Sequence, residues 1–331
     1  MSNTIFSRAP VRICDIGGWT DTWFCPDGAV FNICVDLYSN VRIVPKNNKK
    51  ITIISENLNL KTIINDVNNI QYDGNLDLLK SAVKRLGIQI GLDIYVRTKA
   101  PPGCGTGTSA SVAVALIAAL AKLSEIKMKP GEIAKLAHQL EVEELGLESG
   151  VQDQYAVALG GINFMEFSYP SVELISIPLK EEKIFELERQ LILVYLGSRS
   201  SSEMHKVVIE NYKNGDERTL KSFEIIKACA RQMRNVIHST ELTSMGELMN
   251  KNWKAQKDLH SSMTNPIIDR AENISMHNGA IGFKLNGAGG GGSATILAGI
   301  GKENTLKKKI TEAGYQILST RIDLKGVQTW G

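Results

Sequence analysis

The sequence predicts a protein of mixed helices and strands, divided into two domains. The chain has 331 residues, which is long enough to bury two hydrophobic cores of ordinary size. Some segments alternate apolar and polar residues, as half-buried strands do, and others place apolar residues at helical spacing. A fully apolar run at 191–197 predicts the central strand of a second domain. We therefore expect one domain over residues 1–185 and another over residues 186–331.

The composition and charge of the chain exclude several classes of partner and location. The net charge is only +3 and the charges are dispersed, which disfavours a nucleic-acid partner. The chain has no apolar run long enough to cross a membrane, and its first residues do not resemble a signal peptide. The five cysteines lack Cys-x-x-Cys spacing, so we expect reduced thiols rather than disulfides or zinc ligands. These observations predict a cytoplasmic protein with no nucleic-acid or membrane partner.

The first half of the chain is expected to form a sheet covered by helices. Strands are expected at 7–13, 29–35, 40–44, 51–55 and 92–98, and the last of these alternates apolar and polar residues. The Asn-rich stretch 57–75 is expected to be an irregular edge of the sheet. Helical spacing predicts helices at 76–86, 112–123 and 130–145. Pro130 suits the start of the third of these helices, and Gly146 suits its end.

The second half is expected to place long helices beside the strand at 191–197. The predicted helices span 217–239, 242–260 and 302–313, with another beginning at Asn265-Pro266, and further strands are predicted at 280–285, 294–300 and 315–322. The Ser-rich stretch 198–203 has two interpretations. It either caps the next helix, with Glu203 completing a capping box, or it presents Arg199 and hydroxyl groups to a ligand.

A glycine loop between a strand and a helix predicts a phosphate site. Residues 101–111 read PPGCGTGTSAS, and glycines allow positive φ and a close approach of the backbone to a ligand. The first N–H groups of the following helix lack partners and carry the positive end of its dipole, which favours phosphate. Thr108 and Ser109 are expected to cap the helix or to face a phosphate-bound magnesium ion. A simple tight turn is the alternative, and the loop lacks the Gly-Lys-Ser/Thr ending of a Walker A loop.

Two further glycine-rich stretches lie near opposite ends of the chain. Residues 15–22 read DIGGWTDT and, taken alone, are consistent with a hairpin turn that carries a surface aspartate. Residues 283–294 read FKLNGAGGGGSA, with four consecutive glycines between two apolar segments. A linker rarely lies inside a hairpin, so these glycines predict a backbone that passes close to another group.

Together the three stretches resemble the three signatures of the GHMP kinases, the family of galactokinase, homoserine kinase, mevalonate kinase and phosphomevalonate kinase. The phosphate loop has the pattern Pro-x-x-x-Gly-x-Gly-x-Ser-Ala, Arg12 stands nine positions before Asp21, and residues 284–292 match Lys-x-x-Gly-Ala-Gly-Gly-Gly-Gly. The resemblance implies an α+β fold of two domains. The first has a mixed sheet with the ATP loop, the second a ferredoxin-like sheet packed on helices, and the active site lies between them.

The resemblance also implies roles for individual residues. Asp153, in an Asp-Gln pair like that of galactokinase, is the expected catalytic base, and Arg12 is expected to stabilise the reacting oxygen. Glu141, twelve positions before Asp153, is the expected magnesium ligand together with Ser109, although a solvated acidic helix end is the alternative. The expected ATP contacts are Pro101, Gly103, Gly105, Gly107, Thr108, Ser109, Ala110 and Ser111, and the expected sugar contacts are Gly18, Trp19, Thr20, Asp21, Gln152, Arg199, Gly289 and Gly290.

The implied activity is the transfer of a phosphoryl group from Mg·ATP to the anomeric hydroxyl of a sugar. Gly18-Trp19 replaces the acidic residue and histidine of galactokinase, so galactose is disfavoured, and this motif resembles that of the fucokinases. The segments around Asp153, Arg199 and Trp330 resemble the heptose-phosphate kinases. We therefore expect D-glycero-D-manno-heptose 7-phosphate as substrate, with L-fucose or another free sugar as the alternative. A sugar sensor without catalysis is an alternative of another class, and the chain is expected to be a monomer or a homodimer.

Overall fold

A large mixed sheet forms the first part of the molecule. The computed structural model describes residues 4–198 and 202–331. The strands of this sheet are β1 (Ile5–Ile16), β2 (Gly28–Lys46), β3 (Ile51–Ser55), β4 (Leu60–Ile64), β5 (Gly91–Thr98), β6 (Ile162–Ser168), β7 (Ser171–Ser176) and β12 (Gln328–Trp330). They follow the order β12-β1-β2-β5-β3-β4, with β6 paired to β2 and to β7. Only the β3–β5 pair is parallel among these described strands, so the sheet is mixed, as predicted.

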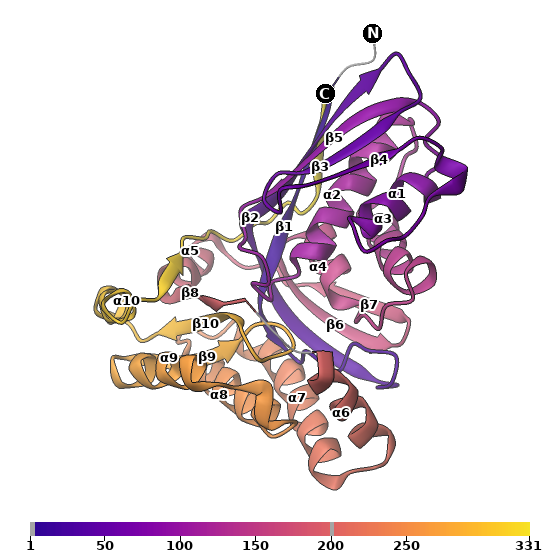
Figure 1. Ribbon diagram of the computed structural model, residues 1–331. Helices are drawn as coiled ribbons and strands as arrows, with labels where there is room; N and C mark the ends of the chain where they lie inside the picture. The colour runs from indigo at the N-terminus through magenta and orange to yellow at the C-terminus, as the bar shows by residue number, and fades with distance from the viewer. Residues whose placement is uncertain (1–3, 199–201) are drawn as a thin grey trace.

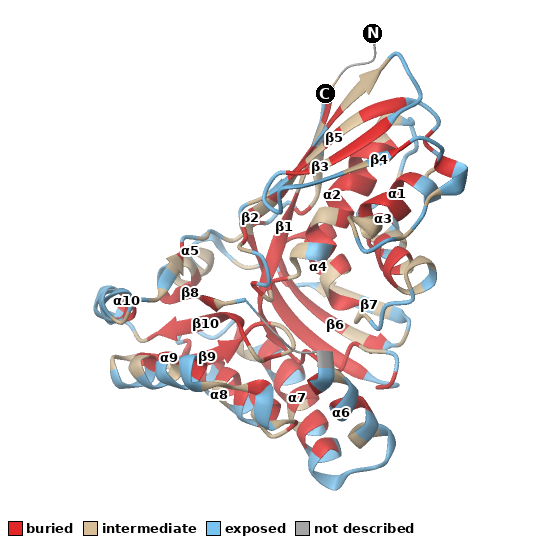
Figure 2. Ribbon diagram, viewed as in Figure 1, coloured by how far each residue is buried: buried red, intermediate tan, exposed pale blue. Residues whose placement is uncertain are grey.

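Four helices cover one face of this sheet (Figure 1). They are α1 (Asp77–Arg85), α2 (Thr108–Leu123), α3 (Pro130–Gln139) and α4 (Gln152–Leu159). The Ala- and Leu-rich α2 lies in the middle of the core with almost all of its residues buried, because small side chains allow close packing on β1 and β2. Figure 2 shows this burial along α2 and the central strands, whereas α6 (Ser202–Lys213) and α10 (Glu303–Glu312) present exposed faces to solvent.

A four-stranded antiparallel sheet forms the second part. Its order is β11 (Gln316–Leu318), β8 (Leu191–Gly197), β10 (Gly292–Ala298) and β9 (Ala280–Leu285), so β8 is an interior strand, as its apolar sequence predicted. The helices α8 (Thr243–Lys257) and α9 (Pro266–His277) pack on β9, and Trp253 and Phe283 lie in the shared core. The predicted two-domain α+β architecture is thus confirmed.

The two domains share a second core. Helix α7 (Glu217–Val236) packs on the lower part of β1 and β2, and its Cys229, Ala230 and Met233 are buried against Ile13 and Phe31. The remaining elements are α5 (Glu181–Gln190), the π-helical turn η2 (Leu140–Glu144) and the short 3₁₀ turns η1 (Val67–Asn69) and η3 (Ser261–Met263). Within the described residues, no helix has the length and apolar character needed to span a bilayer.

The structure differs from three local expectations. The predicted strands at 29–35 and 40–44 form one strand, β2, whose first half pairs with β6 and whose second half pairs with β5. The stretch 57–75 contains a regular edge strand, β4, which antiparallel pairing with β3 stabilises despite its polar sequence. The predicted helix 130–145 is helical as far as Glu144, but beyond Gln139 it is π-helical rather than α-helical, a feature often found at functional sites.

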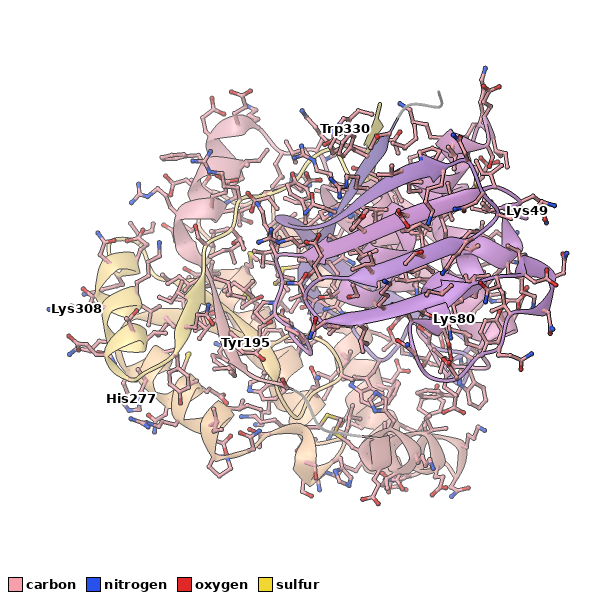
Figure 3. The ribbon with its side chains drawn as sticks, turned by 45° about the horizontal axis from the view of Figure 1, so that its top comes forward. Lys49, Lys80, Tyr195, His277, Lys308 and Trp330 are labelled. Atoms are coloured by element: carbon pink, nitrogen blue, oxygen red, sulfur yellow. The ribbon has the colours of Figure 1, made fainter. Side chains whose placement is uncertain are left out.

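The last strand returns to the first sheet. β12 pairs antiparallel with β1, placing Trp330 opposite Phe6, and the two rings stack with centroids 6.0 Å apart. Figure 3 shows Trp330 at the edge of this sheet. The proposed domain boundary between residues 185 and 186 falls inside α5. Because β12 belongs to the first sheet, the chain passes from the first domain to the second and later returns to the first.

Candidate active site

A cavity of about 440 Å³ lies where the three glycine-rich stretches meet. The phosphate loop contributes residues 103–109, and the segments around β1 and α4 contribute Arg12, Asp15, Trp19, Asp21, Thr22, Trp23, Phe24, Glu148, Ser149, Gly150, Gln152 and Asp153. The second domain contributes His205, Ile209, Gly287 and Ala288. The cavity therefore lies between the domains, where the active site was expected.

The phosphate loop has the backbone conformation that its glycines allow. Gly103, Gly105 and Gly107 have φ values of 67°, 75° and 70°, respectively, all in the left-handed region. Gly107 is the N-cap of α2. The expectation that Thr108 or Ser109 caps the helix is wrong, because both lie inside its first turn and no side chain caps it. The first N–H groups of α2 thus have no side-chain acceptor, which favours a bound anion.

Part of the predicted ATP-binding set lies outside the cavity lining. The hydroxyl of Ser111 is buried and donates to the carbonyl oxygen of Ala9 at 2.9 Å, so it anchors α2 to β1. Pro101 and Ala110 also lie outside the lining, whereas Thr108 and Ser109 belong to it. The structure therefore brings residues 103–109 to the cavity and gives Ser111 a packing role.

Arg12 connects the phosphate loop to Asp153. Its Nε donates to Oδ1 of Asp153 at 2.7 Å, its Nη2 lies 3.3 Å from Oδ2, and its Nη1 donates to the carbonyl oxygen of Gly105 at 2.5 Å. Burial alone would lower the pKa of Arg12, but the carboxylates of Asp153 and Asp15 outweigh this effect and raise it. Asp153 lies in the first turn of α4 with 28% of its side chain exposed, so it faces the cavity.

Asp21 and Gln152 form a second polar pair in the cavity. The carboxylate of Asp21 accepts hydrogen bonds from the backbone N–H of Gln152 at 3.0 Å and from its Nε2 at 3.3 Å. Burial raises the pKa of Asp21 to about 6. The Oε1 atom of Gln152 is buried without a hydrogen-bond partner among the described residues, so this pair leaves a polar acceptor for a ligand.

Trp19 forms one wall of the cavity. Its Nε1 donates to the carbonyl oxygen of Ala288 at 3.1 Å, and its ring centroid lies 4.9 Å from that of His205 on α6. The neighbouring Gly18 and Thr20 are outside the cavity lining. Thr20 accepts from the N–H of Ala29 at 3.1 Å and is buried, so it fixes the shape of the loop rather than facing a ligand.

The third glycine stretch contributes different residues from those predicted. Gly287 and Ala288 line the cavity. Gly289 and Gly290 instead pack on Met263, whose carbonyl oxygen accepts from the N–H of Gly290 at 2.9 Å. The structure thus does not bring Gly289 and Gly290 to the cavity, and the predicted contact Arg199 lies outside the described residues.

Glu141 is buried in the π-helical turn, 6% exposed, so a solvated acidic end does not describe it. Its Oε2 accepts from Oγ of Ser149 at 2.6 Å and from Nε2 of Gln154 at 2.8 Å. Burial raises the pKa of Glu141 to about 7. Its neighbour Glu144 behaves differently and forms a surface ion pair with Lys84.

Sequence reasoning assigned no role to Asp15. This carboxylate is 1% exposed and lies 3.6 Å from Nζ of Lys284 and 3.8 Å from Nη1 of Arg12. Asp15 lies near the end of β1, and the signal in the sequence is a single acidic residue within an apolar segment of a strand. Charged residues are rarely buried without partners, so such a residue predicts a buried counter-ion.

The matches to known proteins agree with this geometry. Residues 77–161 match the model of the GHMP kinases N terminal domain, and residues 226–316 match that of the GHMP kinases C terminal domain. The chain belongs to the GHMP kinase family. As a GHMP kinase it uses ATP as phosphate donor, and its phosphate loop, residues 101–111, lies within the first match.

Individual relatives of this GHMP kinase include sugar kinases. It is 29% identical to the D-glycero-alpha-D-manno-heptose 7-phosphate kinase of Campylobacter jejuni over 99% of both chains. It is 28% identical to the bifunctional fucokinase/GDP-fucose pyrophosphorylase of Arabidopsis thaliana, over 87% of this chain and 29% of that protein. The crystal structure of a sugar kinase from Campylobacter jejuni superimposes with a TM-score of 0.81 and 26% identity, covering 99% of this chain and 98% of the other. The chain is therefore an ATP-dependent kinase related over its whole length to a sugar kinase.

Proposed function

We propose that this GHMP kinase transfers the γ-phosphoryl group of ATP to the anomeric hydroxyl of a sugar, and that the sugar is D-glycero-D-manno-heptose 7-phosphate. The observation that carries the reaction is the Arg12–Asp153 pair beside the phosphate loop, inside the cavity between the domains. The full-length similarity to the Campylobacter jejuni heptose kinase supports the choice of sugar. We also propose a cytoplasmic location, which the free cysteines among the described residues favour.

The proposed chemistry needs positioning and charge stabilisation more than covalent catalysis. Asp153 orients the attacking hydroxyl and takes its proton. Arg12 contacts both Asp153 and the carbonyl oxygen of Gly105, so its guanidinium is fixed where negative charge develops on the transferred group. The phosphate loop and the first turn of α2 supply N–H groups to the phosphates.

The sugar is proposed to bind at Asp21, Gln152 and Trp19. Asp21 and the unpartnered Oε1 of Gln152 accept hydrogen bonds from sugar hydroxyls. Trp19 offers an apolar surface to the sugar ring. Because the hydrogen bonds from Gln152 hold the Asp21 carboxylate, the acceptor is oriented before the sugar arrives.

Magnesium is proposed to bind at Ser109 and Glu141, in keeping with its preference for oxygen ligands. The two hydrogen bonds that Glu141 receives both go to Oε2, so Oε1 would be its ligand atom, although Glu141 is not among the residues that line the cavity. Ser109 lies at the cavity in the first turn of α2. When bound, Mg²⁺ neutralises charge on the phosphate oxygens.

L-fucose or another free sugar is the second candidate. The cavity lining includes the apolar side chains of Trp19, Trp23, Phe24 and Ile209, which suit the carbon-rich face of an uncharged sugar. Trp19 is also the residue on which the resemblance of the first motif to fucokinases depends.

An ADP-release assay with Mg·ATP and a panel of free sugars and sugar phosphates tests the proposal, with Asp153→Asn as control. Turnover of a heptose 7-phosphate that the variant loses is the expected result. Turnover of fucose alone would contradict the substrate and keep the reaction. Sugar binding without turnover of any sugar would contradict the reaction and favour the sugar sensor.

A further inference from the structure

A row of four charges links the second domain to the reacting groups. The fully buried Lys284 on β9 has its Nζ 3.6 Å from Oδ1 of Asp15. The other carboxylate oxygen of Asp15 lies 3.8 Å from Nη1 of Arg12, which in turn binds Asp153. The row therefore alternates between cation and anion, and it crosses from one domain to the other between Lys284 and Asp15.

Asp15 also holds the third glycine stretch in place. Its Oδ2 and Oδ1 lie 3.0 and 3.2 Å from the backbone nitrogen of Gly287, whose N–H donates to the carboxylate. Gly287 packs on the phosphate loop so closely that a Cβ at this position would lie 2.9 Å from the carbonyl oxygen of Gly105. The position of the Asp15 carboxylate thus determines how the two loops meet at the cavity.

Asp15 and Lys284 depend on each other because both are removed from water. Burial lowers the pKa of Lys284, and the charge of Asp15 is the largest opposing influence. The Asp15 side chain is 1% exposed, and a buried carboxylate without a counter-ion is strongly unfavourable. Loss of Asp15 alone leaves Lys284 as a buried cation near Arg12. Loss of Lys284 alone leaves one cation, Arg12, to balance the carboxylates of both Asp15 and Asp153.

We propose that Asp15 is a positioning residue for phosphoryl transfer. It fixes Gly287 against the phosphate loop and balances the charge of Lys284, so that Arg12 keeps its place between Gly105 and Asp153. Asp15 acts through Gly287 and Arg12 rather than on the sugar. The inference rests on the proposed roles of Arg12 and Asp153 in the reaction.

The test is a double-mutant cycle in the full chain with Asp15→Asn and Lys284→Met, followed by steady-state kinetics. Asp15→Asn keeps an oxygen acceptor for Gly287 but removes the charge. We expect each single change to lower kcat about tenfold, with the KM for ATP changed less than about threefold, because Arg12 acts in the transition state. The double variant has no unpaired charge and is expected to regain at least about fivefold in kcat over either single variant.

A second pair of variants separates the hydrogen bond from the charge. Asp15→Ala/Lys284→Met also has no unpaired charge, but it removes the acceptor for Gly287. Its kcat is expected about tenfold below that of Asp15→Asn/Lys284→Met, and equal values would overturn the role of Asp15 in holding the loop. Both double variants are charge-balanced, so this comparison remains decisive if a single variant does not fold.

Other outcomes distinguish this inference from the proposed function. If Asp15 has a purely structural role, its variants will reduce the folded fraction without changing kcat per folded molecule, and this result would overturn the inference. The inference is also overturned if the effects of the two single substitutions on kcat simply multiply in the double variant. An inactive Asp153→Asn with a fully active Asp15→Asn contradicts the inference alone, whereas an active Asp153→Asn contradicts the proposed mechanism. If no sugar is turned over, the proposed function fails. In that case the same variants are compared by their midpoints of thermal unfolding. If the shift of the double variant equals the sum of the two single shifts, the Asp15–Lys284 pairing is overturned.

Discussion

Gly150 lies directly against the carboxylate of Asp21. A Cβ at position 150 would lie 2.3 Å from Oδ2 of Asp21, well inside van der Waals contact. The N–H of Val151 next to it donates to the carbonyl oxygen of Asp21 at 3.2 Å, so the backbone here cannot simply withdraw. The segment before α4 and the loop after β1 therefore hold each other in place at the proposed sugar site.

Gly150→Ala is expected to displace Asp21 and to lower kcat/KM for the sugar about tenfold or more, since small displacements at a reacting site have large effects. The KM for ATP should stay close to that of the wild type. Gly131→Ala is the matched control, because no neighbour lies within 4 Å of its added Cβ on α3. Equal sugar kinetics for both variants would contradict the assignment of Asp21 to the sugar.

Arg12→Lys is expected to lower kcat about a hundredfold, because one ammonium group cannot replace a planar guanidinium with several donors. Arg12 contacts both carboxylate oxygens of Asp153 and the carbonyl oxygen of Gly105. The control is Arg8→Lys on the same strand, where the guanidinium binds Gln328 outside the cavity. Steady-state or stopped-flow kinetics measure kcat for both variants. A wild-type kcat for Arg12→Lys would contradict the proposed role of Arg12.

Asp21 should make the ligand-free protein less stable as the pH rises. Its pKa is about 6 in the folded protein and about 3.9 in an unfolded chain, so protonation favours the folded state. Its contribution is complete below about pH 4 and is lost as the pH rises through 6, amounting to about 2–3 kcal/mol.

Asp21→Asn is therefore expected to be more stable than the wild type at pH 7.5 and similar to it near about pH 4. Denaturant unfolding of both proteins at the two pH values measures the difference. Glu141 contributes with the same sign in both proteins, so it cancels in the comparison. A difference that does not change with pH would show that Asp21 is not protonated preferentially in the folded state.

Tyr195 of the second domain reaches the phosphate loop, and Figure 3 labels it where the two sheets approach each other. Its hydroxyl donates to the carbonyl oxygen of Pro102 at 3.3 Å. Tyr195→Phe is expected to raise the KM for ATP about two- to tenfold, the range for one hydrogen bond. Tyr315→Phe is the control, because its hydroxyl binds Ile267 within the second domain. Equal ATP affinity in both variants would mean that the Tyr195 contact does not position the loop.

The sequence was sufficient to predict the fold and to predict that the three glycine-rich stretches lie together, because glycines are required where the backbone closely approaches another group. The close contact of Gly105 with Asn286 illustrates this, since a Cβ at position 105 would lie 2.7 Å from the carbonyl oxygen of Asn286. Asp15 and Lys284 were not paired in advance, because nothing local indicates which of many charges will be buried together. Gly289 and Gly290 were assigned to the sugar for a related reason, since the run of glycines does not show which of them faces Met263.

The strands were harder to delimit than the loops. The continuity of β2 depends on two different partner strands, and no local pattern reveals that a strand changes partners along its length. The pairing of β12 with β1 joins opposite ends of the sequence, and so short a strand carries no periodic signal.

The return of β12 to the first sheet has a mechanical consequence. The two domains are joined by two covalent connections, one through α5 and one between β11 and β12, where Ile322 bridges to Val35. Two connections restrict the relative movement of the two domains more than a single linker would, and the core that α7 shares with β1 and β2 restricts it further. Ser293 Oγ donates to the carbonyl oxygen of Cys104 at 2.8 Å across this gap, and Asp15 accepts from Gly287. Covalent connections and hydrogen bonds thus hold the two domains together on both sides of the cavity.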